Sequence, residues 1–494
     1  MSDNKQSLLL FQLGPVQSFI AQAQTVGDLA VGSAILSEIT KAAIQKVPDY
    51  KSEEVLVFPS TKGNENLEGI PNRFLAFVPK GEGEKIAVAC ADAAREALVT
   101  LADETYKIFN RDHPGKLDNP AAFLAQVNQF LQITWVVLEN PTREMGKDYK
   151  AIGKLMAMRR NTREFDQWQE ESDGQPKDVL SGKEVALCKG LGAMNLIKRY
   201  HATQTKYEDA LDKLLKNEKD KYIAVIAMDG DKMGEALSNF KDIDEHRKFS
   251  EKLGQFANSV SEDLSKNKDG EKESLLIYAG GDDVLAVVKA TDAIGVAKKL
   301  QERFKKMVGN TASAGIAIGH SSVPLQDLVH AAHAAESRAK NSYHRDALAI
   351  SIYKRSGEIL EWGCGWDSPA LDIYDELTTL SEEDKAEEIS IGRFPYKLAA
   401  LLQPYELKGE VDGAMLPIVM AEYDHAVEQT KDMRKDKVDR LSRDKVEAYL
   451  KACFEKKPED VKEQEKKKSA GRAEDFLNLF MAETFINRPR EGEE

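Results

Sequence analysis

The order of predicted strands and helices favours an α+β chain with two ferredoxin-like domains, a helical insert between them and a helical carboxyl-terminal domain. Three observations support this fold class. A βαββαβ order of apolar and amphipathic segments occurs over residues 8–138 and again over residues 221–353. The segments between and after these repeats show mainly helical patterns. A chain of 494 residues is also too long for one hydrophobic core and suggests several domains.

The first repeat opens with an apolar strand at residues 8–13. Pro15 then begins a long helix predicted to end at about Lys46, since proline is favoured in the first turn of a helix. The remaining elements of this repeat are strands at 54–58 and 73–78, a helix at about 84–110 and a strand at 131–138.

The second repeat follows the same order and adds one helix and one strand. Its predicted elements are a strand at 221–228, a helix at 243–266, strands at 274–279 and 284–289, a helix at 291–307, a strand at 312–319, a helix at 325–340 and a strand at 347–353. The predicted domains are therefore residues 1–138, 139–215, 216–358 and 359–494.

A Gly-Gly-Asp-Asp sequence forms the predicted hairpin of the second repeat. Gly280 and Gly281 suit a tight turn, so Asp282 and Asp283 are expected at its tip. An ordinary hairpin turn is the alternative, because glycine and aspartate are both common turn residues. A turn alone needs neither two adjacent uncompensated acids nor another acid pair at the end of a second apolar strand, and it is this combination that favours a functional site.

A second acidic cluster, Asp229-Gly230-Asp231, ends the first strand of the same repeat. If that strand lies beside the hairpin, three or four carboxylates converge. Magnesium is usually held by one or two carboxylates together with substrate phosphates. The combination predicts a nucleotidyl transferase with two metal ions, magnesium or manganese, that flank a displacement at phosphorus. The opening strand of the first repeat, residues 8–13, has no carboxylate, so that repeat is expected to be degenerate.

Composition limits the environment of the chain. It is 42% hydrophobic and 31% charged. No apolar stretch approaches the ~20 residues that span a bilayer, and the amino terminus does not resemble a signal peptide, so we expect no membrane contact and a cytoplasmic location. The formal net charge of −14 argues against this chain alone wrapping nucleic acid. The widely spaced cysteines predict free thiols: Cys90, Cys188, Cys364 and Cys453.

Charged helical patterns dominate from about residue 360 onward. Acids and bases alternate over 431–445 and 451–468, which is typical of a solvated helix face. An RNA contact is the alternative for the basic run at 466–468, but acids rather than aromatic residues interleave it. His330 and His333 lie three apart on a predicted helix and are expected to be packed or solvent-facing rather than ligands.

Several short segments carry a resemblance to one known family. GPVQSFIAQA at residues 14–23 and DLAVGS at residues 28–33 are similar to the opening of the first palm domain in the large subunit of Cmr-type (type III-B) CRISPR effector complexes. Further similar segments lie, in order, at residues 71–74, 162–165, 228–234, 280–283, 313–316 and 354–357. An ordered series along nearly the whole chain is more specific than Gly-Gly-Asp-Asp, which diguanylate cyclases resemble in their own hairpin.

The resemblance implies two palm (cyclase-like) domains, of which 1–138 is degenerate and 216–358 is catalytic. It implies an enzyme, activated by target RNA, that joins ATP into cyclic oligoadenylates or a related second messenger. The residues that match the metal-binding catalytic acids of the family are Asp229, Asp282 and Asp283.

The resemblance also implies the nucleotide-binding residues. Gly230 and Asp231 complete the first-strand motif, and Gly280 and Gly281 let the hairpin backbone approach a nucleotide closely. Lys340 matches a phosphate-binding lysine of related cyclase palms. A solvated cation at a helix end, favoured by the helix dipole, is the alternative for Lys340.

The implied partners are the other Cmr-type subunits, with crRNA and target RNA bound through the complex. Guide and target sequences are read by base pairing, so they are not encoded in this chain. The implied substrate is ATP or another adenosine nucleotide. The sequence leaves the product open between one made from ATP alone, one made from GTP, and one in which ATP is joined to another adenosine compound such as S-adenosylmethionine.

Two features depart from the family pattern. Many members begin with a histidine-aspartate nuclease domain that cuts single-stranded DNA, whereas here thirteen residues precede Gly14 and contain no His-Asp pair. DNase activity is therefore not expected. Members often bind zinc through paired cysteines in the middle segment, but only Cys188, near Lys198 and Arg199, lies in a comparable place, so the sequence gives zinc little support.

Two other functions stay open. One is a catalytically silent scaffold subunit of the crRNA complex, which the presence of both acid clusters disfavours. The other is a free-standing diguanylate-cyclase-like signalling enzyme, which the Gly-Gly-Asp-Asp hairpin and the degenerate first repeat disfavour.

Overall fold

Two compact units make up the chain. The computed structural model describes residues 5–52, 54–62, 67, 69–142, 144–162, 174–205, 207, 209–216, 221–265, 274–386, 394–407, 413–429, 442–454 and 472–487. The first unit comprises Met1–Lys213 and Lys232–Leu285, and the second comprises Leu214–Asp231 and Ala286–Glu494. The basic run at 466–468 lies outside the described residues, as do parts of 162–165, 431–445 and 451–468. The four-domain division stays a prediction.

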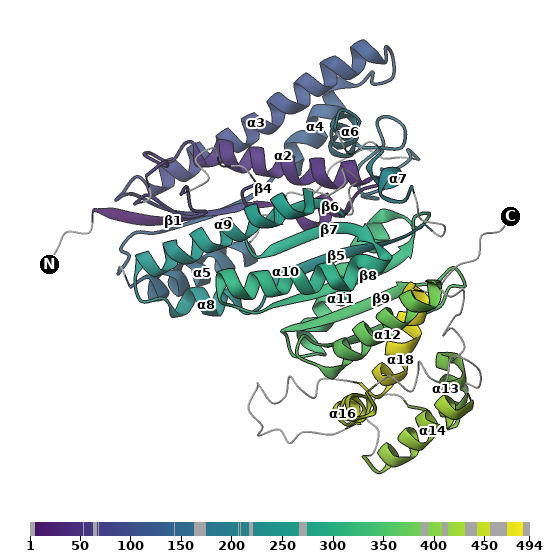
Figure 1. The fold of residues 1–494 in the computed structure, drawn as a ribbon. Coiled ribbons are helices and arrows are strands. Elements are labelled where there is room, and N and C mark those ends of the chain that lie inside the picture. The colour runs from purple at the N-terminus through teal and green to yellow at the C-terminus, as the bar shows by residue number, and fades with distance from the viewer. Residues whose placement is uncertain are drawn as a thin grey trace. The chain divides into compact units, whose positions relative to one another are not determined.

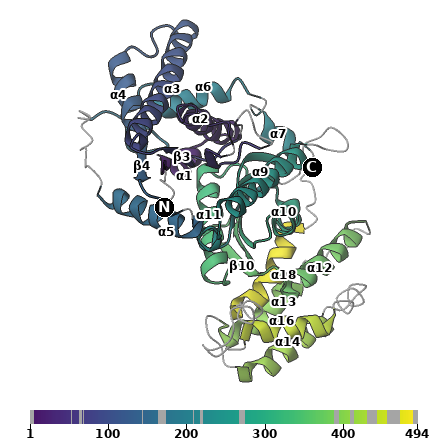
Figure 2. The ribbon, with the colours of Figure 1, turned by 90° about the vertical axis from the view of Figure 1, so that its left-hand side faces the viewer.

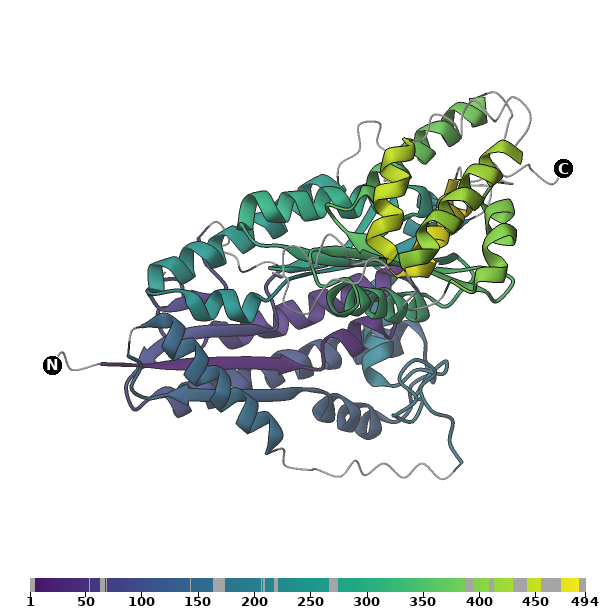
Figure 3. The ribbon, with the colours of Figure 1, turned by 90° about the horizontal axis from the view of Figure 1, so that it is seen from below.

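A four-stranded antiparallel sheet lies in the first unit (Figure 1). Its strands are β1 (Gln6–Gly14), β2 (Leu56–Phe58), β3 (Arg73–Pro79) and β4 (Gln132–Leu138). The strand order is β2-β3-β1-β4, and Figure 3 shows β1, in purple, running through the interior of the sheet. These strands confirm the predicted first repeat.

Both faces of β1 are covered, which explains its continuous apolar run. Leu8 and Leu10 pack with Ile152 of α5 (Met145–Asn161) in one buried cluster. Successive side chains of a strand point to opposite faces, so Phe11 lies on the other face, where its ring stacks on that of Phe74 with centroids 4.9 Å apart.

Two helices replace the single helix predicted over 15–46. They are α1 (Gln17–Ala21) and α2 (Val26–Ile44). The Thr25 hydroxyl accepts a hydrogen bond from the Asp28 N–H at 3.2 Å, and the Asp28 carboxylate accepts one from the Thr25 N–H at 3.0 Å. This capping box begins a new helix, which the amphipathic pattern alone does not reveal.

The helical insert packs onto the first repeat. Lys198 of α6 (Ala193–Ala202) is 0% exposed and donates a hydrogen bond to the Phe19 carbonyl at 2.6 Å. Its neighbour Arg199 donates to both carboxylate oxygens of Asp28, at 2.7 and 2.6 Å. The other helices of this part of the chain are α3 (Gly83–Asp112), α4 (Pro120–Phe130), α6 (Ala193–Ala202), α7 (Ala210–Leu214), α8 (Met233–Asn239) and α9 (Ile243–Ser265).

A second sheet contains the strands of the second repeat. They are β5 (Tyr222–Gly230), β6 (Ser274–Gly280), β7 (Asp283–Lys289), β8 (Ala312–His320), β9 (Ala347–Tyr353) and β10 (Ile359–Gly365), in the order β10-β9-β8-β5-β7-β6. In both sheets the first strand of the repeat lies between its third and fourth strands. This shared order confirms the two ferredoxin-like repeats. The boundary between the two compact units falls within β7.

The strand β10 corrects the sequence prediction of a helical domain from residue 359 onward. β10 pairs with β9 in antiparallel register, from Ile359 opposite Tyr353 to Gly365 opposite Ala347. Trp362 of this strand is 0% exposed. The sheet edge offered by β9 decides this conformation, and it is a tertiary feature that the local sequence does not show.

Two helices of the second unit, α10 (Ala293–Val308) and α11 (Leu325–Asn341), pack on its strands, and the later ones form the carboxyl-terminal group seen in Figure 2. The later helices among the described residues are α12 (Pro369–Ala386), α13 (Phe394–Leu402), α14 (Leu416–Gln429), α16 (Arg443–Phe454) and α18 (Ala473–Asn487). Short 3₁₀ turns lie at Ala290–Asp292, Gln403–Tyr405 and Gly413–Met415. Gly315 of β8 allows the approach of α11, since a Cβ there would lie 2.1 Å from the Glu336 nitrogen.

Two further sequence predictions concern the cysteines and the membrane. All four cysteines are buried free thiols, as predicted. Among the described helices, none combines the length and the apolar character needed to cross a bilayer.

Candidate active site

The predicted acids lie where strands of the second sheet begin or end. Asp229 is the penultimate residue of β5, and Asp231 follows that strand directly. Asp282 lies in the turn between β6 and β7, and Asp283 is the first residue of β7. Asp229 and Asp231 belong to the second compact unit, and Asp282 and Asp283 belong to the first.

Asp229 forms an ion pair with Lys340, and Lys340 forms a second ion pair with Glu336 at 2.7 Å. The Lys340 side chain is 18% exposed. Glu336 and Lys340 lie one turn apart on α11, so one helix face brings an acid and a base to the carboxyl end of β5. The alternative of a solvated helix-end cation therefore does not describe Lys340.

The charges around Asp229 shift one another's pKa values. Burial raises the pKa of Asp229, although the Lys340 ammonium opposes this shift. Burial acts to lower the pKa of Lys340, but its two carboxylate partners outweigh this and hold the pKa above the ordinary value. Burial acts to raise the pKa of Glu336, but hydrogen bonds with His333 and Lys340 hold it below the ordinary value. Lys340 is therefore a fixed positive charge beside Asp229 at neutral pH.

Asp231 is 2% exposed, and both of its carboxylate oxygens accept hydrogen bonds. The donors are the Thr311 hydroxyl at 2.8 Å, the Ser313 hydroxyl at 2.7 Å and the Asp346 N–H at 2.9 Å. The Asp231 N–H also donates to the Thr311 carbonyl at 2.8 Å. Asp231 therefore ties the end of β5 to the segments that lead into β8 and β9, and its role toward a nucleotide stays a prediction.

The hairpin has one glycine that the backbone requires and one that it does not. Gly281 has a φ of 76°, in the region that favours glycine. A Cβ at Gly280 would meet no described atom within 4 Å, so the surrounding protein does not demand a glycine there. The Tyr278 hydroxyl donates a hydrogen bond to Asp283 Oδ2 at 3.0 Å and orients that carboxylate.

Two cavities of the first unit border this hairpin. One, of about 430 Å³, is lined by Tyr278, Gly280 and Asp283 together with residues of the first repeat that include Ser33 and Asn72. The other, of about 540 Å³, reaches Ala279 and Gly281 from the side of α9. Both cavities are large enough for part of a nucleotide. Segments 28–33 and 71–74, which carry part of the family resemblance, line the 430 Å³ cavity together with the hairpin.

The described residues contain no group of three or more His, Cys, Asp and Glu side chains arranged to hold a metal ion. The donor chemistry of the acids still suits magnesium, which commonly takes one or two carboxylates and completes its shell with phosphates and water.

The other ligand candidates of the sequence are a cysteine and two histidines. Cys188 is a buried free thiol, and its backbone forms an isolated β-bridge with that of Leu191. His330 is exposed, and His333 contacts Glu336 at 3.5 Å.

Sequence reasoning missed two side chains that hold the acids. Tyr278 orients Asp283, and Glu336 shares Lys340 with Asp229. The i,i+4 spacing of Glu336 and Lys340 was a readable signal for their pairing. No local signal pointed to the first-repeat residues of the 430 Å³ cavity, because they meet the hairpin only in the folded chain.

Comparison with known proteins gives two family matches. Residues 222–349 match "Cas10/Cmr2, second palm domain", and residues 8–103 match "CRISPR-associated protein Cmr2, N-terminal". The CRISPR system Cmr subunit Cmr2 of Pyrococcus furiosus is 24% identical over 570 aligned positions, which cover 77% of this chain. The chain spans 65% of the length of that relative.

Solved structures share the fold. One is a type III-B Cmr-beta structure in the apo state, with a TM-score of 0.62, 10% identity, and coverage of 98% of this chain and 82% of the other. Another is a Csm1–Csm4 cassette in complex with cA4, with a TM-score of 0.50, 13% identity, and coverage of 90% and 70%. At these identities the likeness is one of fold.

Proposed function

Because the chain belongs to the family of Cmr-type CRISPR large subunits, we propose that it is an RNA-activated nucleotidyl transferase of a type III-B antiviral effector complex. Its product is a cyclic oligoadenylate or a related adenosine-nucleotide second messenger made from ATP. The observation that carries this proposal is the Gly-Gly-Asp-Asp hairpin at the edge of a 430 Å³ cavity, in a palm domain whose first strand ends in Asp229. The similar Csm1–Csm4 cassette solved with cA4 supports the choice of product class.

Three carboxylates are proposed to act together. What supports this is the position of the acids within one repeat, since Asp229 lies at the end of its first strand and Asp282 and Asp283 lie at its hairpin. Asp229, Asp282 and Asp283 would hold two magnesium or manganese ions. When bound, such ions lower the pKa of an attacking ribose hydroxyl and neutralise the leaving pyrophosphate.

The other residues of the site bind and orient the nucleotides. The space above Gly280 lets a phosphate or a ribose approach the hairpin backbone, and Gly281 keeps the turn tight. Lys340 is available as a phosphate ligand because it is already fixed as a cation beside Asp229. Gly230 and Asp231 support the strand end that presents Asp229.

The proposed partners are the other subunits of the complex, with crRNA and target RNA bound through them. The net charge of −14 is consistent with RNA binding that this chain shares rather than performs alone. A site that consumes ATP continuously would waste it, so its activity must be regulated. Small displacements of the reacting groups are sufficient to turn the activity off, since a 1 Å misplacement can cost about a hundredfold in rate. Target RNA would then act by binding the active arrangement more tightly than the inactive one.

The alternative is a catalytically silent scaffold subunit. It is favoured by one observation, that no three ligand side chains converge on a metal position among the described residues. The family matches, in turn, do not support a free-standing diguanylate cyclase.

Nucleotide turnover separates these functions. The isolated chain and the assembled complex are each incubated with labelled ATP and magnesium, with and without target RNA, and the products are resolved by chromatography. We expect product only from the complex with target RNA. Equal turnover in all four conditions would contradict the regulation but keep the catalysis, and absence of product in all four would favour the scaffold.

A further inference from the structure

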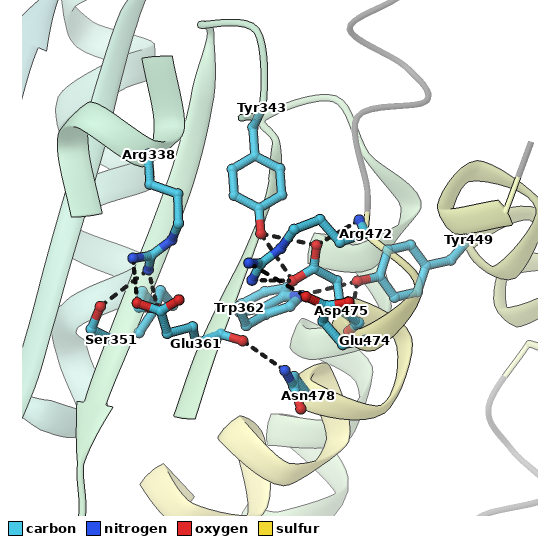
Figure 4. A network of polar contacts seen from close by, with 11 residues as sticks. Arg338, Tyr343, Ser351, Glu361, Trp362, Tyr449, Arg472, Glu474, Asp475 and Asn478 are labelled. Atoms are coloured by element: carbon cyan, nitrogen blue, oxygen red, sulfur yellow. Dashed lines mark hydrogen bonds and ion pairs between the residues drawn. The ribbon is translucent and has the colours of Figure 1, made fainter. Parts of the chain in front are cut away.

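A buried polar network joins the carboxyl-terminal helix α18 to the turn that connects α11 with β9 (Figure 4). Tyr343 and Asp475 are both 0% exposed, and the Tyr343 hydroxyl donates to the two carboxylate oxygens of Asp475 at 2.9 Å each. The Arg472 N–H donates to Asp475 Oδ2 at 2.7 Å. Burial raises the pKa of Asp475 to about 6, which still leaves the carboxylate ionised and accepting at pH 7.

The same helix is anchored to β10 and, through β10, to α11. Asn478 of α18 donates to the Glu361 carbonyl at 2.8 Å, and the Glu361 carboxylate accepts from Arg338 of α11 at 2.6 Å. The Tyr449 hydroxyl donates to the Asp475 carbonyl at 3.0 Å and accepts from Trp362 at 3.0 Å. Figure 4 shows two neighbouring groups of these side chains, one around Asp475 and one where Arg338 meets Glu361, with Asn478 bonded to the Glu361 carbonyl. The position of α18 is therefore fixed relative to the end of α11.

The turn after Tyr343 is strained. His344, Arg345 and Asp346 have φ angles of 59°, 66° and 47°, so three successive residues other than glycine lie in the left-handed region. Each such residue is less stable than ordinary backbone, because its Cβ lies too close to the following carbonyl oxygen. A conformation of this kind persists only when contacts at its ends over-determine it.

The far end of the turn contacts the acid-bearing end of β5. The Asp346 N–H donates to Asp231 Oδ2 at 2.9 Å, and the Asp346 carboxylate accepts from Gln301 at 3.0 Å. Asp231 lies two residues after Asp229. One strained turn thus has α18 at one end and the strand end that carries Asp229 at the other.

We infer that the turn at 344–346 is the element through which α18 positions the end of β5, with Tyr343 and Asp346 as positioning residues for Asp229. The inference rests on the proposed function for its catalytic consequence, but the mechanical coupling stands on the contacts alone. Loss of the Tyr343 hydroxyl leaves a buried carboxylate short of a donor and lets the turn relax. The Asp346 N–H then holds Asp231 less firmly, and the end of β5 depends more on its contacts with Thr311 and Ser313.

Hydrogen exchange of the full chain tests the coupling without reference to catalysis. Tyr343→Phe is compared with the matched control Tyr374→Phe, which also removes a buried tyrosine hydroxyl beside α18. The Tyr374 hydroxyl accepts a hydrogen bond from Asn487 at 3.4 Å, and none of the hydrogen bonds among the described residues joins it to the turn. We expect about tenfold faster amide exchange in peptides covering 225–232 and 341–350 for Tyr343→Phe, and wild-type rates in these peptides for Tyr374→Phe. If Tyr343→Phe does not fold, Asp475→Asn keeps one acceptor oxygen and is expected to give the same pattern.

Two results would overturn the coupling. One is a Tyr343→Phe variant in which amide exchange becomes faster in peptide 341–350 but stays at the wild-type rate in peptide 225–232. The other is a Tyr374→Phe control in which exchange becomes faster in both peptides to the same extent as in Tyr343→Phe. Nucleotide synthesis by the assembled complex is measured in parallel, where Tyr343→Phe is expected to lower kcat about tenfold with little change in KM for ATP. If the wild-type complex makes no product but Tyr343→Phe still speeds amide exchange in both peptides, the proposed function is contradicted and the coupling stands.

Discussion

Replacing Asp282 and Asp283 together by alanine is expected to lower nucleotide synthesis by the RNA-bound complex on the order of a thousandfold or more, because stabilisation of charge at a transferring phosphoryl group carries effects of this size. Both residues lie at a turn and at the start of a strand, and both are only half-buried. Assembly and RNA binding should therefore be unchanged. Product formation from labelled ATP is the measurement.

The matched control removes two acids from the exposed surface of α3. Asp92 and Asp103 have side chains that are 70% and 49% exposed. Asp92→Ala combined with Asp103→Ala changes the net charge by the same amount and is expected to keep wild-type synthesis. Full product formation by the hairpin variant, in a complex that assembles normally, would remove these two acids from the site.

Replacing Lys340 by methionine is expected to lower kcat/KM for ATP roughly a hundredfold, the scale of losing one preorganised electrostatic contact in an active site. Methionine keeps the length and apolar stem of the side chain but leaves Asp229 and Glu336 without their shared cation. The free energy of unfolding should also fall, mainly because Glu336 is only 13% exposed, whereas solvent screens the charge of Asp229, which is one third exposed.

Lys340→Arg is the companion variant, because it keeps the positive charge and changes only its shape. It should retain more activity than Lys340→Met at every ATP concentration. Initial rates over a range of ATP and magnesium concentrations measure both variants. Wild-type rates from Lys340→Met would show that Lys340 has a structural role alone.

The fold was predictable where the pattern was local. Alternating apolar runs and amphipathic segments located the strands of both repeats, and their order led to the same sheet arrangement twice. The break before Thr25 and the strand β10 were missed for different reasons. A capping box interrupts a helix without interrupting its apolar periodicity, and β10 forms because the neighbouring strand offers it an edge.

The site was predictable only in its residue types. The acids and glycines of the two motifs were found in sequence because they stand next to turn and strand signals. The contacts that define their roles come from residues far along the chain, such as Thr311 and Asp346 around Asp231. The ion pair of Asp229 with Lys340 joins a strand to a helix that follows it by about a hundred residues, and only the packing of α11 on β5 brings the two together.

The joint action of Asp229 with Asp282 and Asp283 is tested most directly by manganese binding, followed by electron paramagnetic resonance, in the assembled complex with a non-hydrolysable ATP analogue. If the acids form one site, Asp229→Ala and the hairpin double variant each weaken manganese binding at least about tenfold. The variant that combines all three substitutions then binds manganese no more weakly than the more severe of the two, since the effects of groups that act as a unit do not add. Wild-type binding by Asp229→Ala, or losses that simply add, would contradict a shared metal site.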